Sequence, residues 1–190
     1  RYWNTKVYRF SIAISFAMLG KKTLLIDADM RKPNQRRLWR INPTTGLCDF
    51  LAKIQDLSIY DVEGIPLSIV CTGTIPPNPS ELLSSEGMKN FVEECSKLYE
   101  YIIIDTPPIN TVADAQIVST FVDGVVLIAK SGNTSTDELN DAIAAVKRAG
   151  GNLCGVVLND MNIKSIKRSY RYKYNYKYKK YSYNDSYESK

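Results

Sequence analysis

Two short apolar runs that end in aspartate constrain the fold of this chain more than any other feature. TLLIDAD (23–29) and YIIIDTPP (101–108) are apolar between their first residue and their carboxylates. Strands of this kind are typical of parallel sheets that are covered on both faces. Because the carboxyl ends of parallel strands meet at one edge of a sheet, the two runs predict an acidic crevice at that edge.

Helix-like and strand-like patterns alternate over the rest of the first 160 residues. Apolar spacing, capping residues and glycine stops predict helices over 9–19, 86–99, 112–120 and 136–151, and further strands over 67–73, 122–130 and 152–160. Residues 75–83 are predicted to be a proline-stiffened loop, with Ser80 or Ser84 capping the next helix. This order predicts an α/β fold with three layers, in which helices cover both faces of a parallel sheet.

Composition excludes several kinds of site. With 190 residues, 44% of them hydrophobic, the chain can form one α/β domain with an appendage. Histidine is absent, which excludes imidazole acid–base chemistry and His-ligated metal sites. The four cysteines show no C-x-x-C spacing and are expected to be reduced and mostly buried, in a cytosolic protein. No apolar run approaches the roughly 18 residues that cross a membrane.

The end of the chain differs from the rest in charge and aromatic content. Residues 161–190 contain nine Lys/Arg and two acidic residues, whereas residues 1–160 contain 16 basic and 18 acidic residues. We therefore divide the chain into a domain over 1–160 and a flexible basic tail over 161–190. The tail contains eight tyrosines: Tyr170, Tyr172, Tyr174, Tyr176, Tyr178, Tyr181, Tyr183 and Tyr187. A nucleic-acid arm, a membrane-surface contact and a solubilising extension are alternative uses of such a tail.

The aspartates at the strand ends form the candidate site. Asp105 is expected to hold Mg²⁺, usually through water, and Asp27 and Asp29 are expected to provide a second acidic pair facing the same metal and phosphates. The alternative is that Asp27 and Asp105 only cap strand ends and begin turns. Two apolar strands that end in aspartate within one sheet favour the metal site.

Several motifs together resemble the bacterial tyrosine kinases, which are deviant-Walker P-loop ATPases. LLIDADMRKP resembles their second Walker motif, called A-prime, and IIIDTPP resembles their Walker B motif. TGTIPPNPSELLSSEGM (72–88) resembles their proline-rich loop, and the tyrosine-rich terminus resembles their phosphorylated tail. Within the family the chain is most similar to the stand-alone cytoplasmic kinases of capsule and exopolysaccharide assembly, whose membrane activator is a separate chain.

The resemblance implies a role for each site residue. Asp27 would lie beside Mg²⁺ or the incoming tyrosine hydroxyl, and Asp29 is the alternative acceptor for the hydroxyl proton. Arg31 would contact phosphates or a neighbouring subunit, and Asn159 would lie near the adenine of ATP. The eight tail tyrosines would be autophosphorylated, by transfer between protomers of a ring-like oligomer held at the inner face of the membrane by its activator. No nucleic-acid partner is expected.

One family motif has no counterpart in the sequence. The family has a Gly-rich P-loop with Lys and Ser/Thr before the first helix, where this chain has RYWNTKVYRF and no glycine before Gly20. The first strand and P-loop are therefore expected to be absent. A truncated or frameshifted gene product, a true pseudokinase and an altered nucleotide loop are the three explanations. The alternatives to an active kinase are a non-catalytic family member, acting as oligomer partner or phosphorylation substrate, and a partitioning-type ATPase.

Overall fold

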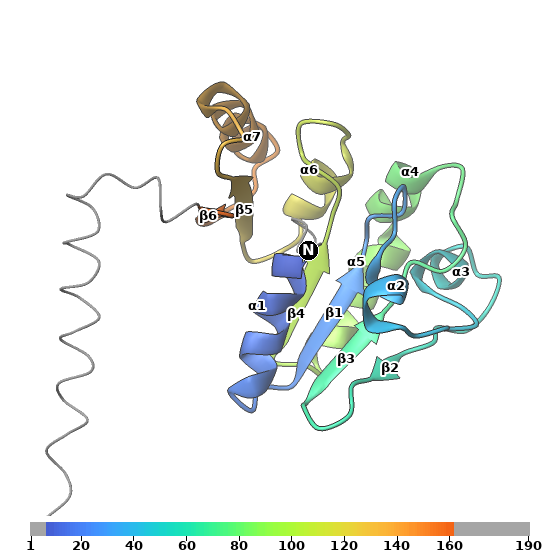
Figure 1. Ribbon diagram of the computed structural model, residues 1–190. Helices are drawn as coiled ribbons and strands as arrows, with labels where there is room; N and C mark the ends of the chain where they lie inside the picture. Colours follow the sequence, from blue (N-terminus) through green and yellow to red (C-terminus); the bar gives the residue numbers. More distant parts are fainter. Residues whose placement is uncertain (1–6, 162–190) are drawn as a thin grey trace, which may run out of the picture.

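The computed structural model describes residues 7–161, with side chains from residue 11 onward. Its elements alternate between helix and strand as the sequence predicts, which confirms the α/β class (Figure 1). The tail tyrosines and residues 1–6, where the sequence offers RYWNTK in place of a phosphate loop, lie outside the described residues.

Three parallel strands form the centre of the main sheet. They are β1 (Thr23–Asp27), β3 (Leu67–Val70) and β4 (Tyr101–Asp105), and β1 lies between the other two. A fourth strand, β2 (Tyr60–Asp61), pairs with β3 in the antiparallel direction, which the sequence analysis did not predict. The chain reverses between β2 and β3 at Gly64, whose φ of +83° is a conformation that favours glycine.

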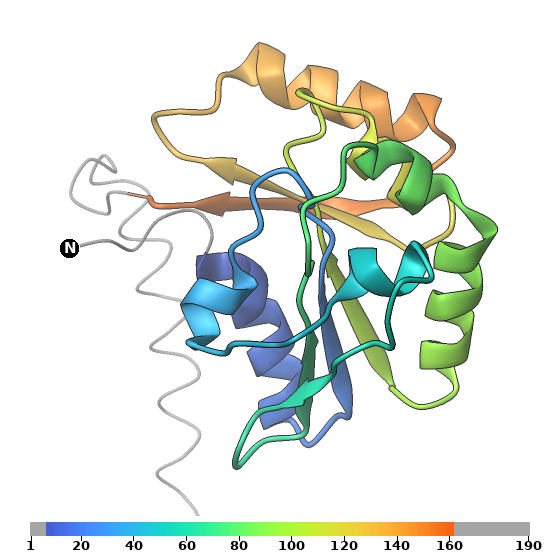
Figure 2. The same cartoon turned by 90° about the vertical axis from the view of Figure 1, so that its right-hand side faces the viewer.

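Helices cover both faces of this sheet, as expected. Leu24 and Ile26 contribute to a buried cluster with Met88 and Phe91 of α5 (Glu86–Ser96). Leu25 points to the opposite face, because side chains alternate along a strand, and belongs to a cluster with Ala13 and Ala17 of α1 (Val7–Met18). Figure 2 shows α1 and α5 on opposite sides of the strands.

The last two strands form a separate sheet, where the sequence analysis predicted one continuous sheet. β5 (Val125–Lys130) and β6 (Leu153–Asn159) are parallel to each other and are packed under α7 (Thr136–Arg148) (Figure 2). Within residues 7–161, β4 pairs only with β1, and β5 pairs only with β6. A ladder forms only when strands lie about 4.8 Å apart, so the sheet is interrupted between β4 and β5.

Three short helices were not predicted from the sequence: α2 (Gln35–Trp39), α3 (Leu47–Leu51) and α4 (Pro79–Ser84). Each is too short to show a helical period in its apolar residues. The predicted loop over 75–83 therefore contains most of α4, which begins with Pro79. Ser80 and Ser84 do not cap α5. Its cap is Ser85, whose Oγ accepts a hydrogen bond from the Met88 nitrogen at 3.2 Å.

All four cysteines are free thiols, as expected, and Cys154 is the exposed one. Burial raises the thiol pKa to about 12 in Cys48 and Cys71 and to about 11 in Cys95. Helices of the described residues are all too short or too polar to cross a membrane.

Candidate active site

Two of the predicted carboxylates meet at the carboxyl edge of the main sheet. Asp27 ends β1 and Asp105 ends β4, and the two residues are direct partners in the register of these neighbouring strands. Their exposed fractions are only 1% and 8%. The structure therefore places two nearly buried carboxylates side by side at the position that the apolar runs predicted.

Asp27 is held by backbone amides as well as by its strand. Its Oδ2 accepts hydrogen bonds from the Asn34 and Gln35 nitrogens, both at 3.0 Å, and its Oδ1 accepts one from the Asp29 nitrogen at 3.3 Å. Burial raises the pKa of Asp27 to about 6, although the Gln35 and Asn34 amides act in the opposite direction, and the charges of Asp105 and Asp29 add to the rise. The carboxyl of Asp27 therefore titrates close to neutral pH.

Gln35 connects helix α2 to both sides of the site, and the sequence analysis did not identify it. Its side chain is 1% exposed, and its Nε2 donates to Asp105 Oδ2 at 3.0 Å. Its Oε1 accepts from Trp39 Nε1 at 3.2 Å. Since its backbone nitrogen binds Asp27, Gln35 fixes both carboxylates relative to α2. The only signal in the sequence is an amide residue shortly after the A-prime motif.

Asp29 and Arg31 lie in the turn that follows β1. Asp29 is 7% exposed, and its Oδ1 accepts from the Lys32 nitrogen at 3.0 Å. Arg31 forms a two-pronged pair with Asp114 of α6 (Asp114–Ser119), with Nε to Oδ2 at 2.8 Å and Nη2 to Oδ1 at 3.1 Å. Ser80 also donates to Asp114, at 2.6 Å. Arg31 thus connects the A-prime turn to α4 and α6, and its predicted contact with phosphate remains a prediction.

The Arg31–Asp114 pair predicts that Asp114→Asn changes stability in opposite directions with and without Arg31. Burial acts to raise the pKa of Asp114, but Arg31 and Ser80 outweigh it and hold the pKa below its usual value. Asp114→Asn alone should lower the free energy of unfolding by about 1 kcal/mol, because a charged hydrogen bond is lost. In an Arg31→Ala background the same change should instead raise stability, because Asp114 would otherwise be a buried carboxylate without its cation. Urea unfolding of the four proteins measures both steps; a decrease in both backgrounds would contradict this account.

Asn159 lies apart from the aspartates, at the end of β6 in the second sheet. Its Oδ1 accepts from the Asp160 nitrogen at 2.6 Å. Its Nδ2 is buried and has no hydrogen-bond partner in the described part of the chain. A buried amide donor without an acceptor is costly, so this atom fits a ligand acceptor such as an adenine nitrogen.

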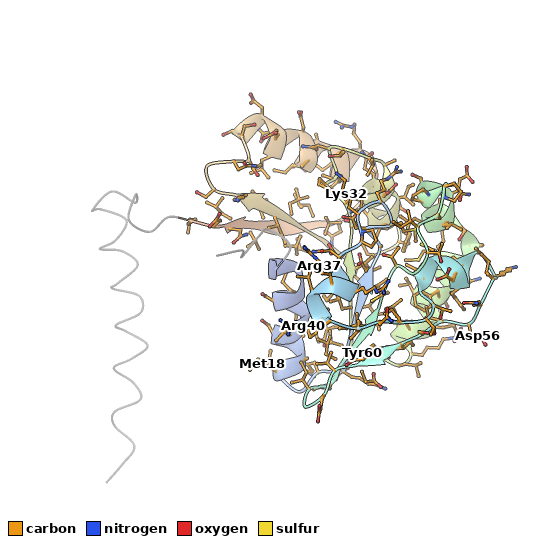
Figure 3. All side chains as sticks on the ribbon, turned by 45° about the vertical axis from the view of Figure 1, so that its right-hand side comes forward. Met18, Lys32, Arg37, Arg40, Asp56 and Tyr60 are labelled. Atoms are coloured by element: carbon orange, nitrogen blue, oxygen red, sulfur yellow. The ribbon has the colours of Figure 1, made fainter. Side chains whose placement is uncertain are left out.

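A pocket of about 740 Å³ opens beside Asp27, over the carboxyl ends of β1 and β3. Its lining includes Asp27, Thr72 of the segment after β3, and three arginines on or next to α2: Arg36, Arg37 and Arg40. Figure 3 shows Arg37 and Arg40 in this part of the molecule, with Lys32 above them. No motif or residue spacing in the sequence predicts this pocket.

The pocket wall contains a close approach between two loops. Asp49 Oδ2 accepts from the Gly46 nitrogen at 2.9 Å and from the Thr74 nitrogen at 3.2 Å. Gly73 lies against both Asp49 and Gly46 at this approach, and its φ is +82°. Thr72 joins this wall to the site, because its Oγ1 donates to the Asp27 carbonyl at 2.8 Å.

Known proteins similar to this chain include two tyrosine-protein kinases. The protein CapB of Staphylococcus aureus is 37% identical over 164 residues, which cover 85% of this chain and 72% of CapB. Tyrosine-protein kinase CpsD of Streptococcus pneumoniae serotype 4 is 38% identical over 156 residues, which cover 80% of this chain and 69% of CpsD. The chain belongs to the bacterial tyrosine-protein kinases. No protein-family model matches it.

Solved structures agree with this membership. The chimerical protein CapA2B2 superposes with a TM-score of 0.79 at 38% identity, over 82% of this chain and 70% of that one. The kinase domain of Escherichia coli tyrosine kinase ETK superposes with a TM-score of 0.78 at 31% identity, over 81% of this chain and 61% of that one. The cell division ATPase MinD of Pyrococcus furiosus, with a TM-score of 0.67 at 18% identity, shares the fold.

The carboxylates and the free amide donor of this site suit Mg²⁺ bound together with a nucleotide. Among residues 7–161 no group of three or more His, Cys, Asp or Glu side chains could hold a metal by itself. Mg²⁺, however, keeps several waters and takes one or two carboxylates together with phosphate oxygens. Asp27 and Asp105 provide such a pair, and Asn159 Nδ2 provides an unused donor.

Proposed function

We propose that this site transfers the γ-phosphate of ATP to protein tyrosine, including the tyrosines of its own tail, in the control of capsular or extracellular polysaccharide assembly. The observation that carries the proposal is the register of Asp27 and Asp105 at the ends of neighbouring strands, in a member of the bacterial tyrosine-protein kinases. A relative from Klebsiella pneumoniae is named for the cps region, which supports the polysaccharide context.

Each residue has a role in this proposal. Asp27 and Asp105 would hold Mg²⁺ through water, and the bound ion would neutralise phosphate charge. A carboxylate of Asp27 or Asp29 would accept the tyrosine proton as the new P–O bond forms. Arg31 would contact phosphates or a second subunit, and Asn159 would donate to the adenine.

We also propose the setting of the reaction. One solved relative is a chimera whose name joins CapA and CapB, which supports a separate partner of the CapA type. That partner would be the membrane activator and would hold the kinase at the cytoplasmic face. Transfer would occur between protomers of a ring-like oligomer.

A phosphotyrosine assay tests the proposal. Purified protein is incubated with Mg·ATP, with and without an activator fragment, and labelling is followed by mass spectrometry. A second form carries one strand and a Gly-x-x-x-x-Gly-Lys-Ser loop fused ahead of Arg1, since this motif cradles phosphates. We expect labelled tail tyrosines in the fused form, and labelling at least tenfold weaker without the added loop.

A matched control changes only the lysine of the added loop to alanine and should remove the gain. Absence of both ATP binding and labelling in every form would contradict the kinase proposal. That result would favour the non-catalytic alternative, an oligomer partner or substrate.

A further inference from the structure

A chain of hydrogen-bond donors leads from helix α2 to Asp105. The indole Nε1 of Trp39 donates to Gln35 Oε1 at 3.2 Å, and Gln35 Nε2 donates to Asp105 Oδ2 at 3.0 Å. Trp39 lies four residues after Gln35 on α2, so one helical turn brings the two side chains to the same face. Both ends of the Gln35 amide are therefore satisfied, although the residue is only 1% exposed.

Trp39 determines which way round the Gln35 amide lies. An indole N–H can only donate, so it requires the oxygen of the amide on its side. The NH₂ group must then face the carboxylate, which in its ionised form can only accept. The indole ring is itself held in place, because it packs against the buried cluster that contains Ala17 of α1 and Leu25 of β1.

Gln35 also contacts the second carboxylate of the site. Its backbone nitrogen donates to Asp27 Oδ2 at 3.0 Å, and Asp27 and Asp105 are partners in the register of β1 and β4. A carboxylate at the end of a strand can still rotate about its side-chain bonds. One donor to each carboxylate, from the same buried residue, restricts how the two are turned relative to one another. This orientation matters for Mg²⁺, which demands near-octahedral geometry.

We propose that Gln35 is a positioning residue of the reaction, which holds Asp105 in the orientation that binds the hydrated metal, and that Trp39 locks the Gln35 amide in the state that can do so. The inference rests on the proposed function, because the metal at Asp27 and Asp105 belongs to that reaction. It adds α2, which lies outside the A-prime and Walker B motifs, to the elements that set metal affinity. Removing the partner of a metal ligand typically lowers metal affinity about 10- to 100-fold.

Metal binding without nucleotide tests the positioning role separately from catalysis. Mn²⁺ is titrated into the full chain as a stand-in for Mg²⁺, and the paramagnetic resonance signal of the free ion gives the dissociation constant. Gln35→Met keeps the volume of the side chain but removes the amide, and should raise that constant about tenfold. Trp39→Phe keeps an aromatic ring but removes the donor, and should raise it by a smaller factor. Asp105→Asn measures the binding that does not depend on this carboxylate.

Gln55→Met is the matched control, because it makes the same change at an exposed residue, and it should bind Mn²⁺ normally. A double variant shows whether Gln35 and Trp39 act as one unit. If Trp39 acts only through Gln35, Trp39→Phe should add nothing in the Gln35→Met background. Circular dichroism verifies the fold of each variant, and Trp39→Phe tests the proposal by itself, since it leaves Gln35 in place.

The P-loop fusion gives a second measurement. Gln35→Met should raise the Mg²⁺ concentration for half-maximal labelling and change the rate at saturating Mg²⁺ far less. A merely structural role of Gln35 would lower the free energy of unfolding and leave this metal dependence unchanged.

Normal Mn²⁺ binding by Gln35→Met, with weaker binding by Asp105→Asn, would overturn the proposal. An effect of Trp39→Phe that is as large in the Gln35→Met background as in the natural chain would overturn the role of Trp39. The expected Mn²⁺ pattern without any phosphotransfer would contradict the kinase function alone. Phosphotransfer with a normal Mg²⁺ dependence in Gln35→Met would contradict the positioning role alone.

Discussion

Asp27→Asn is expected to reduce phosphotyrosine formation at least a hundredfold and to stabilise the fold at pH 7.5. The loss of activity follows because asparagine provides neither a negative ligand for Mg²⁺ nor a proton acceptor. The gain in stability follows from the pKa of about 6, which is above the ordinary 3.8. Keeping this carboxyl ionised at neutral pH costs up to about 3 kcal/mol. Asparagine keeps one oxygen for the Asn34 and Gln35 amides, but its Nδ2 cannot accept the hydrogen bond from the Asp29 nitrogen, and the loss of that bond offsets about 1 kcal/mol of the gain.

The pH dependence shows whether this explanation is correct. Because the folded pKa is raised, the contribution of Asp27 to stability is fully present below pH 3.8 and is lost as pH rises to about 6. The stability difference between Asp27→Asn and the natural chain should therefore be small near pH 4 and reach about 2 kcal/mol above pH 6. Urea unfolding in EDTA measures this difference, and labelling in the P-loop fusion measures activity.

Asp123→Asn provides the matched control for Asp27→Asn, because Asp123 is exposed in the loop before β5. It should change neither labelling nor the pH profile. A stability difference that is constant from pH 4 to 7.5 would show that burial of the Asp27 charge is not its cause.

Gly73→Ala is expected to destabilise the protein more than Gly64→Ala. Both glycines have positive φ, +82° and +83°, so both changes carry a backbone cost of about 1–2 kcal/mol. A Cβ at residue 64 would meet nothing within 4 Å, whereas one at residue 73 would overlap Asp49 Oδ2 and lie 2.7 Å from the Gly46 nitrogen. This overlap should add about 1–3 kcal/mol.

Thermal and urea unfolding of the two glycine variants measure the difference, and Gly64→Ala is the internal control for positive φ. Equal destabilisation by the two changes would mean that the loops at Gly46 and Gly73 separate without cost.

The carboxylate pair could be predicted because its signal is local. Asp27 and Asp105 each follow an apolar run, and parallel pairing then places the two strand ends together. Arg31 shows the limit of this reasoning. Its motif suggested contact with phosphates or a neighbouring subunit, which stays a prediction, and did not indicate that its guanidinium pairs with Asp114, which is 83 residues away in the sequence. The residue pattern around Asp114 contains no indication of that contact.

The sequence by itself determined the α/β class, the helices on both faces, the two strand-end aspartates and the family resemblance. These properties follow from the local period of apolar residues and from short motifs, which the chain carries wherever it folds. Only the tertiary structure decided the break between β4 and β5, the Gln35 bridge to Asp105 over 70 residues, and the arginine-lined pocket. Those features depend on the side chains and strand edges that distant segments bring together, and no local period encodes such contacts.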